Sequence, residues 1–250
     1  MNQAIRIGAA SLAAFLLVLI ARFPAHWAAP ALPESVSCDV ITGSIWTGTC
    51  YGLTVRSGQG RPLRLGTLGW SLRPTRLLLG RLSARIELTR ASGTVQGMIE
   101  RELGGALVGR AIQASLPLDP TLFTQLPPNL QGSVRADLAH VRIDDGVVRD
   151  LQGRIEVLDL EQRGSQAMPL GSYTLMFPGA SDGEPVGQLR DREGPLSVEG
   201  TLRLTAEPGY VIEGKVAPRP GAPTGLTQQL QFLGRPDSEG RRSFSLAGTF

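Results

Sequence analysis

Apolar and polar side chains alternate along most of the chain after residue 31. In the stretch SVRADLAHVRI, residues 133–143, Val134, Ala136 and Leu138 are each separated by a charged residue. A period of two residues places successive side chains on opposite faces of a β-strand. The pattern therefore predicts strands that have one apolar face and one solvated face.

A short signature opens several of these alternating runs: an apolar residue, Gln or Glu, Gly, any residue, and a second apolar residue. It occurs as VQGMI, LQGSV, LQGRI, VEGTL and IEGKV, beginning at Val95, Leu130, Leu151, Val198 and Ile212. The uneven spacing excludes a solenoid with a fixed repeat. Turn sequences such as Asp144-Asp145-Gly146 separate the runs, and glycine inside a strand favours bends and bulges. We therefore predict an all-β fold with one large, strongly curved antiparallel sheet, either a partly open barrel or a taco-like sheet.

Helix signals are few. The best is TGLTQQLQFLG, which ends at Gly234. Its apolar face consists of Leu226, Leu230 and Leu233. A shorter signal, Asp119-Pro120 followed by TLFTQL, predicts a capped turn with proline in the first helical position. The sequence thus predicts short helical additions to the sheet.

The first thirty residues differ in composition from the rest. The run IGAASLAAFLLVLIA, residues 7–21, contains no charge, which is typical of a signal peptide or of a single membrane anchor. Ala29-Pro30-Ala31 is an indifferent cleavage site, so we favour a retained anchor. The predicted organisation is a cytoplasmic tail over residues 1–6, a transmembrane anchor over residues 7–25 and one exported β domain over residues 31–250.

Two arginines that flank this run account for most of the net positive charge of the chain. The formal net charge is +3, but Arg6 and Arg22 flank the run, and without them 23 basic residues face 22 acidic ones. A nearly neutral body is a poor binder of polyphosphates, so we expect no nucleic-acid partner. Arg6 also favours a cytoplasmic N-terminus.

Residues suited to catalysis are scarce. The two histidines are His26, at the edge of the anchor, and His140, in a predicted strand. The stretch GASDG, residues 179–183, matches the G-x-S-x-G pattern of a nucleophile elbow, but no histidine follows it. Cys38 and Cys50 have no nearby histidine and cannot supply four zinc ligands. We expect no catalytic residues, no cofactor and no metal site, and hence no enzyme.

Three motifs occur in a recognisable order. They are GSIWTG at residues 43–48, WSLRP at residues 70–74 followed by LLLGRL, and LGRPDSEGR at residues 233–241 ahead of a closing strand. In this order they resemble the protein N family of bacterial type II secretion systems, and the resemblance spans essentially the whole chain. The positions that carry it, which we expect to be structural, are Gly43, Trp46, Gly48, Trp70, Pro74, Gly234, Pro236, Asp237 and Gly240.

The resemblance implies a bitopic component of the cell inner membrane, with the bulk in the periplasm of a Gram-negative bacterium. Such a protein supports export of folded periplasmic proteins across the outer membrane. Its implied partners are the other single-span proteins of the assembly platform and the outer-membrane secretin.

The alternative function is lipid binding. The family is similar in fold to AsmA-like and lipopolysaccharide-transport proteins, whose bent sheets form an apolar groove. The chain would then be a periplasmic groove-type binding protein for lipid or another amphiphile. Alternation shows an apolar face but not what covers it, so both functions stay open.

An exported body gives the two cysteines an oxidising environment, which favours a disulfide between Cys38 and Cys50. Both are equally distant from Ser44, so they would face each other across a hairpin that turns at Gly43-Ser44-Ile45. A register displaced by one residue would place them on opposite faces. Free buried thiols are the alternative. The bridge would hold the strand of Trp46 near the start of the sheet.

Overall fold

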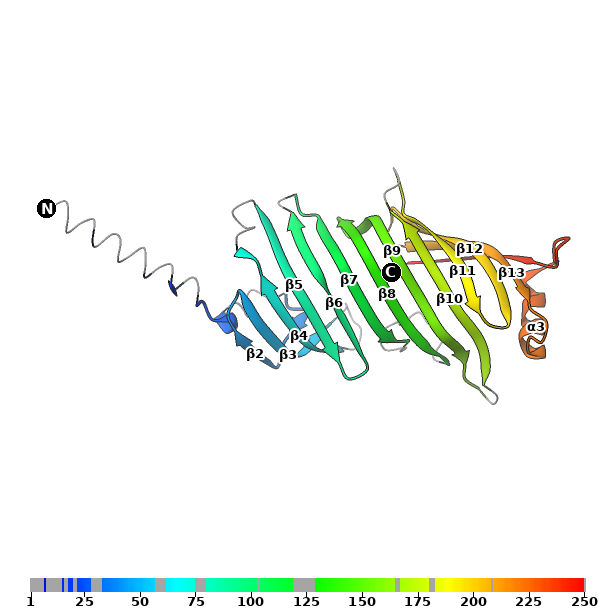
Figure 1. Cartoon of the computed structure of the whole chain (residues 1–250), viewed down its shortest axis with the longest axis horizontal. Coiled ribbons are helices and arrows are strands. Elements are labelled where there is room, and N and C mark those ends of the chain that lie inside the picture. The colour runs from blue at the N-terminus through cyan, green and yellow to red at the C-terminus, as the bar shows by residue number, and fades with distance from the viewer. Residues whose placement is uncertain are drawn as a thin grey trace. The chain divides into compact units, whose positions relative to one another are not determined.

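The structure is a computed structural model of the chain (Figure 1). It describes residues 7, 15, 18–19, 22–27, 33–56, 62–74, 80–102, 104–118, 129–164, 167–179, 183–207 and 209–249. The chain divides into two compact units, residues 1–90 and residues 91–250. The named strands pair antiparallel within each unit, so the prediction of an antiparallel all-β fold is confirmed. The predicted extent of one domain over residues 31–250 stays a prediction.

The first unit is a small and irregular sheet. Its strands are β1 (Val36–Ser37), β2 (Val40–Gly43), β3 (Thr47–Val55), β4 (Leu63–Leu72) and β5 (Arg81–Arg90). β3 pairs with β1 and β2 as well as with β4, and β4 pairs with β5. The register between β3 and β4 shifts between Cys50 and Leu53, where Gly52 has a positive φ of 67°. This bulge bends β3 in the middle of the sheet.

The second unit has longer strands, each paired with the next along the chain. They are β6 (Gly93–Glu102), β7 (Leu107–Pro117), β8 (Leu130–Asp144), β9 (Val147–Gln162), β10 (Met168–Pro178), β11 (Val186–Glu193), β12 (Leu196–Thr205), β13 (Gly209–Pro218) and β14 (Arg242–Thr249). Figure 1 shows β7 to β13 side by side. Asp145 and Gly146 join β8 to β9 with positive φ angles of 49° and 78°, as the predicted Asp-Gly turn requires.

The glycines of the recurring signature lie where strands bulge or approach closely. The register shifts across Gly97, between β6 and β7, and across Gly132, between β8 and β9. Gly200 of β12 lies directly opposite Gly214 of β13. A Cβ at Gly214 would come within 2.9 Å of the ring of Phe244, so the missing side chain leaves room for that ring. The predicted bends at strand glycines are therefore confirmed at Gly97 and Gly132.

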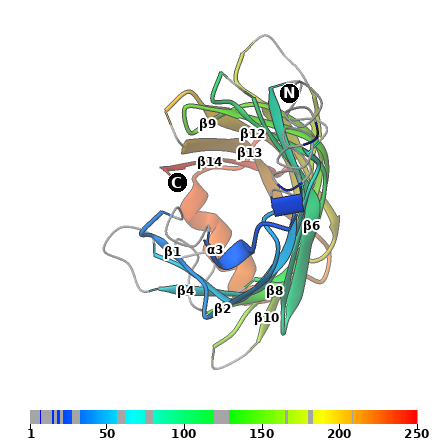
Figure 2. The ribbon, with the colours of Figure 1, turned by 90° about the vertical axis from the view of Figure 1, so that its left-hand side faces the viewer.

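The predicted C-terminal helix is present on the apolar face of the second unit (Figure 2). It comprises α3 (Thr224–Leu230) and the 3₁₀ turn η2 (Gln231–Leu233), and it ends before Gly234, whose φ is 93°. Leu226 and Leu230 are buried in a cluster formed with Leu196, Val198 and Val216. The prediction was wrong for Leu233, which is 41% exposed. The tighter winding of the 3₁₀ turn rotates this residue away from the line of Leu226 and Leu230.

A second cluster shows that the sheet of this unit is curved. Leu151 of β9, Phe177 of β10 and Leu204 of β12 are buried together, with partly buried residues of β8 and β13 packed against them. Strands β9 and β12 are not neighbours in the pairing order, so the sheet bends far enough for its apolar face to pack on itself. Figure 2 shows β9 beside β12. The apolar side chains of β8 to β13 thus form a core of their own.

Most of the predicted anchor, residues 7–25, lies outside the described residues. Among those that are described, no helix has the length and apolar character to cross a membrane. The end of the segment is described and lies on the β2–β3 hairpin. Pro24 forms a bridge with Ser44, and the Ile45 N–H donates to the carbonyl of Phe23 over 3.0 Å. Ala25 is 3% exposed. The predicted capped turn at Asp119-Pro120 also lies outside the described residues.

Candidate functional site

The two cysteines form a disulfide at the base of the β2–β3 hairpin. Their Cα atoms are 5.6 Å apart, and the predicted bridge is confirmed. The predicted pairing was wrong, because Cys50 lies opposite Ile41 and the turn comprises residues 44–46. The Ser44 N–H donates to the Thr47 carbonyl over 2.8 Å and closes the turn. The turn therefore lies further along the chain than the predicted turn at Gly43-Ser44-Ile45. Cys38 lies in the break between β1 and β2 and reaches Cys50 diagonally.

Two motifs meet at this hairpin. Trp70 of β4 lies opposite Gly48 of β3, and its indole N–H donates to the carbonyl of Ile45 over 3.1 Å. A Cβ at Gly48 would lie 2.4 Å from the Trp70 ring, so glycine makes room for the indole. Gly43 has a φ of 89°, and a Cβ there would lie 2.5 Å from the Thr47 carbonyl. Trp46 contributes its carbonyl, which accepts the Leu72 N–H over 2.6 Å.

The hairpin, the disulfide and Trp70 line an open apolar cavity of about 330 Å³ in the first unit. Its lining includes Ala25, Ile41, Ile45, Leu53, Leu68 and Trp70, together with both cysteines. Among the described residues, none that lines it carries a charge. Sequence reasoning missed this cavity, although Leu68, Trp70 and Leu72 alternate in β4 and carried the signal. The arrangement can hold an apolar group and offers no chemistry for a reaction.

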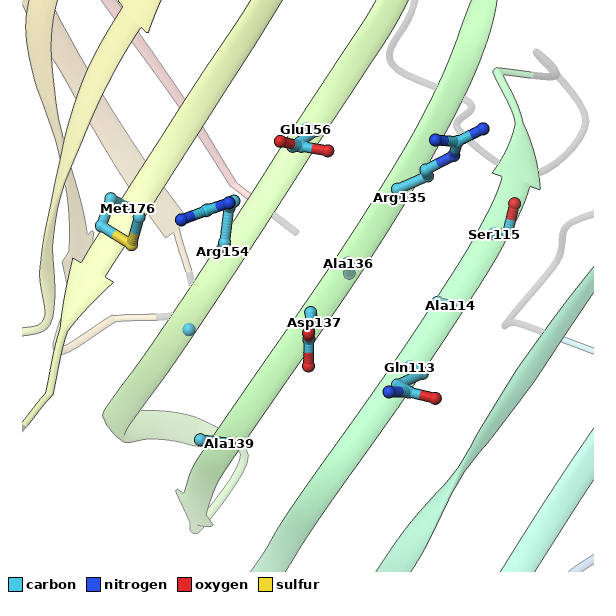
Figure 3. A pocket seen from close by; sticks show the side chains of 11 residues that line it. Gln113, Ala114, Ser115, Arg135, Ala136, Asp137, Ala139, Arg154, Glu156 and Met176 are labelled. Carbon is cyan, nitrogen blue, oxygen red and sulfur yellow. The ribbon is translucent and has the colours of Figure 1, made fainter.

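A shallow hollow of about 610 Å³ lies on the polar face of β7 to β10 (Figure 3). Arg135 of β8 lies opposite Glu156 of β9, and Asp137 lies opposite Arg154. Arg192 of β11 forms an ion pair with Glu156, with Nη1 2.8 Å from Oε1. Figure 3 shows the side chains of the two cross-strand pairs of β8 and β9 spread along the strands rather than converging on one point. The prediction of strands with one solvated face is therefore confirmed for this part of the sheet.

The structure does not bring together the histidines and the G-x-S-x-G stretch, which were the candidates for catalysis. His140 lies 3.5 Å from Asp150, Nε2 to Oδ2, on the strands β8 and β9. His26 lies against the ring of Trp27 in the first unit. Ser181 of the G-x-S-x-G match lies outside the described residues. In the described ranges, no group of three His, Cys, Asp or Glu side chains is placed to hold a metal ion.

The third motif forms a hydrogen-bonded loop between η2 and β14. Oδ1 of Asp237 accepts the N–H groups of Glu239 and Arg241, each over 2.9 Å. Oδ2 accepts Nζ of Lys215 over 3.0 Å, and Lys215 is the only lysine of the chain. The hydrogen bond from Lys215, followed by that from the Arg241 backbone, holds the pKa of Asp237 below its usual range. Gly240 closes the loop with a φ of 77°.

The remaining motif positions lie just beyond the ends of η2 and β4. Gly234 ends η2, and Pro236 begins the loop after it. Pro74 is exposed just beyond β4 and does not line the cavity. The motif positions therefore divide between the region of the β2–β3 hairpin and β4 in the first unit, where Trp70 alone of them lines the cavity, and the Asp237 loop of the second unit.

A polar cluster that the sequence did not reveal lies beside the α3 core. The Tyr173 hydroxyl donates to the Leu170 carbonyl over 2.6 Å. Asp191 accepts the Val198 N–H over 2.7 Å and forms an ion pair with Arg219. Burial, and then the charge of Asp191, raise the pKa of Tyr173 to about 12, while Arg219 opposes this shift. The cluster satisfies polar groups within an apolar environment and is structural.

Comparison with known proteins identifies the chain. The family model described as "Type II secretion system (T2SS), protein N" matches residues 34–245. The chain is 26% identical over 254 residues to type II secretion system protein N of Aeromonas hydrophila, covering 96% of both chains. It is 24% identical over 259 residues to the protein of the same name from Vibrio cholerae serotype O1 (strain ATCC 39315 / El Tor Inaba N16961), covering 99% of both chains. No solved structure gives a significant match. The chain therefore belongs to the protein N family of type II secretion systems and is a type II secretion component.

Proposed function

We propose that this chain is a bitopic inner-membrane component of the type II secretion system. It acts as a structural and interaction protein of the assembly platform, with the bulk of the chain in the periplasm. The observation that carries the proposal is the family match, which extends over residues 34–245 and so covers both units. The polar hollow and the apolar cavity, neither of which carries a catalytic arrangement, agree with a non-enzymatic role.

The first unit supports the bitopic part of the proposal. The uncharged run over residues 7–21 leads directly into Phe23-Pro24-Ala25, which is hydrogen-bonded to the β2–β3 hairpin. An anchor in this position would hold the hairpin close to the membrane surface. The Cys38–Cys50 disulfide supports exposure of the body to an oxidising compartment.

The test is co-isolation of the full-length chain with the rest of the platform. An affinity-tagged chain, expressed in a Gram-negative cell that carries the type II system, is extracted in detergent and purified. We expect the other single-span platform proteins to co-purify, and the outer-membrane secretin to follow after cross-linking. A bitopic protein from another pathway with the same tag is the control. An intact chain that never co-purifies with any of these proteins would refute the proposal.

The apolar cavity of the first unit favours a second candidate function, binding of a lipid or another amphiphile. Its volume of about 330 Å³ is in the range of small-ligand sites, and its lining is apolar. The apolar face of β8 to β13 gives no such support, because its own side chains pack there. Mass spectrometry of the natively purified chain should then detect a bound lipid that is lost in Ile41→Phe, which fills the cavity. Absence of lipid from the unmodified chain would refute this candidate.

A further inference from the structure

Strand β14 forms an open edge of the sheet in the second unit. It pairs with β13 over its whole length, from Gly209 opposite Thr249 to Val216 opposite Arg242, without a shift of register. In the part of the chain that the structure describes, no strand pairs with its other side. Such an edge presents a row of backbone N–H and C=O groups that can pair with another chain.

The sequence of β14 contains none of the usual protections of an edge. Natural edge strands are commonly interrupted by lysine, proline or a bulge, or are very short. β14 reads RSFSLAGT, so no charge and no proline occur between Ser243 and Thr249. The strand is eight residues long and regular. Its backbone is therefore available to an added strand along nearly its whole length.

Exposed apolar side chains lie beside this edge. Leu246 is on the same face as Phe244, which packs against the α3 core, yet it is 55% exposed. The turn η2 lies against β14, and its Phe232 is 91% exposed. Exposed large apolar side chains on a strand edge and on the turn that contacts it are typical of a surface that a partner buries.

We propose that β14 is the docking edge for an extended segment of another type II secretion component, which adds to the sheet as a further strand. This inference rests on the proposed function and names the surface that it uses. The added strand pairs with the β14 backbone and places apolar side chains, at every second position, against Leu246 and Phe232. Because β14 is uncharged from Ser243 onward, the bound segment is also uncharged there, and the contact is insensitive to salt.

Site-specific photo-crosslinking in the full-length chain tests the backbone pairing. A photoreactive residue replaces Ser243, Ser245 or Ala247, which are exposed on one face of β14, and Thr201 of the interior strand β12 is the control. An added strand predicts cross-links from all three β14 positions to one protein. The cross-linked residues must advance in steps along a single segment of that protein. Cross-links that scatter over the partner, or form equally from Thr201, would overturn the inference.

A charge placed on the apolar side of the edge tests the side-chain contact. We expect Leu246→Lys to lower the amount of co-purified partner about tenfold, with little effect of salt concentration on the unmodified complex. Met176→Lys is the matched control, since Met176 is 37% exposed on the interior strand β10, and it should retain the partner. Retention of the partner by folded Leu246→Lys would overturn the inference. Should Leu246→Lys fail to fold, the cross-links in the otherwise unmodified chain decide.

The two proposals fail in different ways. A chain that co-purifies with platform proteins but gives no cross-links from β14 retains the proposed function and overturns the docking edge. An unmodified chain that co-purifies with no platform protein overturns both.

Discussion

The hairpin of the first unit and the C-terminal strand of the second unit differ in how far their edges are open to pairing with another strand. β1 and β2 have two and four residues, with a break between them where Cys38 bonds to Cys50. β14 has eight residues, a continuous register and no covalent restraint of this kind. Short, interrupted strands offer little continuous backbone for pairing with another chain, whereas a long regular strand offers a continuous row of N–H and C=O groups.

The interiors of the two regions differ as well. The hairpin region contains an open apolar cavity, and Ala25 at the end of the predicted anchor is part of its lining. Beside β14, by contrast, α3 fills the apolar face with Leu226 and Leu230. The comparison indicates that the first region is held in shape by local restraints and the second by packing, with its edge left available.

Loss of packing under α3 should have the largest effect on stability. Leu226 is 4% exposed, and Leu226→Ala should lower the free energy of unfolding by about 2–5 kcal/mol through lost burial and a cavity. Leu233→Ala is the control, since Leu233 is 41% exposed and its change should cost about 0.5 kcal/mol or less. Denaturant unfolding in detergent measures both. Equal losses for the two variants would contradict the assignment of the α3 core.

Removal of the disulfide should have the next largest effect. The bridge spans 12 residues of sequence, and Cys38→Ala with Cys50→Ala should lower the free energy of unfolding by about 3 kcal/mol. Reduction of the unmodified chain should reproduce the loss. A count of free thiols in the unreduced, denatured chain should be zero, and two free thiols would exclude the bridge.

The contact of Gly48 with Trp70 predicts a smaller loss. A Cβ at Gly48 overlaps the indole and comes within 2.7 Å of the Thr42 carbonyl, so Gly48→Ala should cost about 1–3 kcal/mol. Gly104→Ala is the matched control, because a Cβ there has no atom within 4 Å. Tryptophan fluorescence should change for the first variant alone. A neutral Gly48→Ala would show that Trp70 is not held as described.

The smallest effect should be the pH dependence from Tyr173. Its pKa is raised to about 12 in the folded state, from an ordinary value of 10.0. Between these values the unfolded chain loses the proton first, so this contribution to stability is complete below pH 10.0 and declines as the pH rises toward 12. Denaturation across this range should show a steeper loss for the unmodified chain than for Tyr173→Phe. Identical slopes would exclude burial of the hydroxyl.

Much of the sheet could be predicted from the sequence, because alternation and turn chemistry act locally. The glycines of the recurring signature predicted bends, and the spacing of Leu226 and Leu230 predicted α3. Both predictions depend only on residues that are close in sequence. The register of the hairpin could not be predicted in the same way. The spacing of Cys38 and Cys50 favoured direct pairing, but the turn lies at residues 44–46, so Cys50 pairs with Ile41 instead.

The cavity and the Asp237 loop could not be predicted because they depend on distant residues. Ala25 and Trp70 meet across forty-five positions of sequence. Lys215 reaches Asp237 from a different strand, and nothing in the local sequence of either residue indicates the contact. Leu233 shows a further limit, because a change from α to 3₁₀ winding redirected a side chain that helical spacing had placed in the core.

Hydrogen–deuterium exchange of the full-length chain in detergent tests most directly the contrast between a closed hairpin and an open edge. In the isolated chain we expect slow exchange in β3, which has pairing strands on both sides, and fast exchange in β14 at every second amide. When the chain is purified together with the platform proteins, the amides of β14 should become protected while those of β3 stay unchanged. β14 amides that are already as protected as those of β13 in the isolated chain, or that remain fast in the complex, would contradict the account.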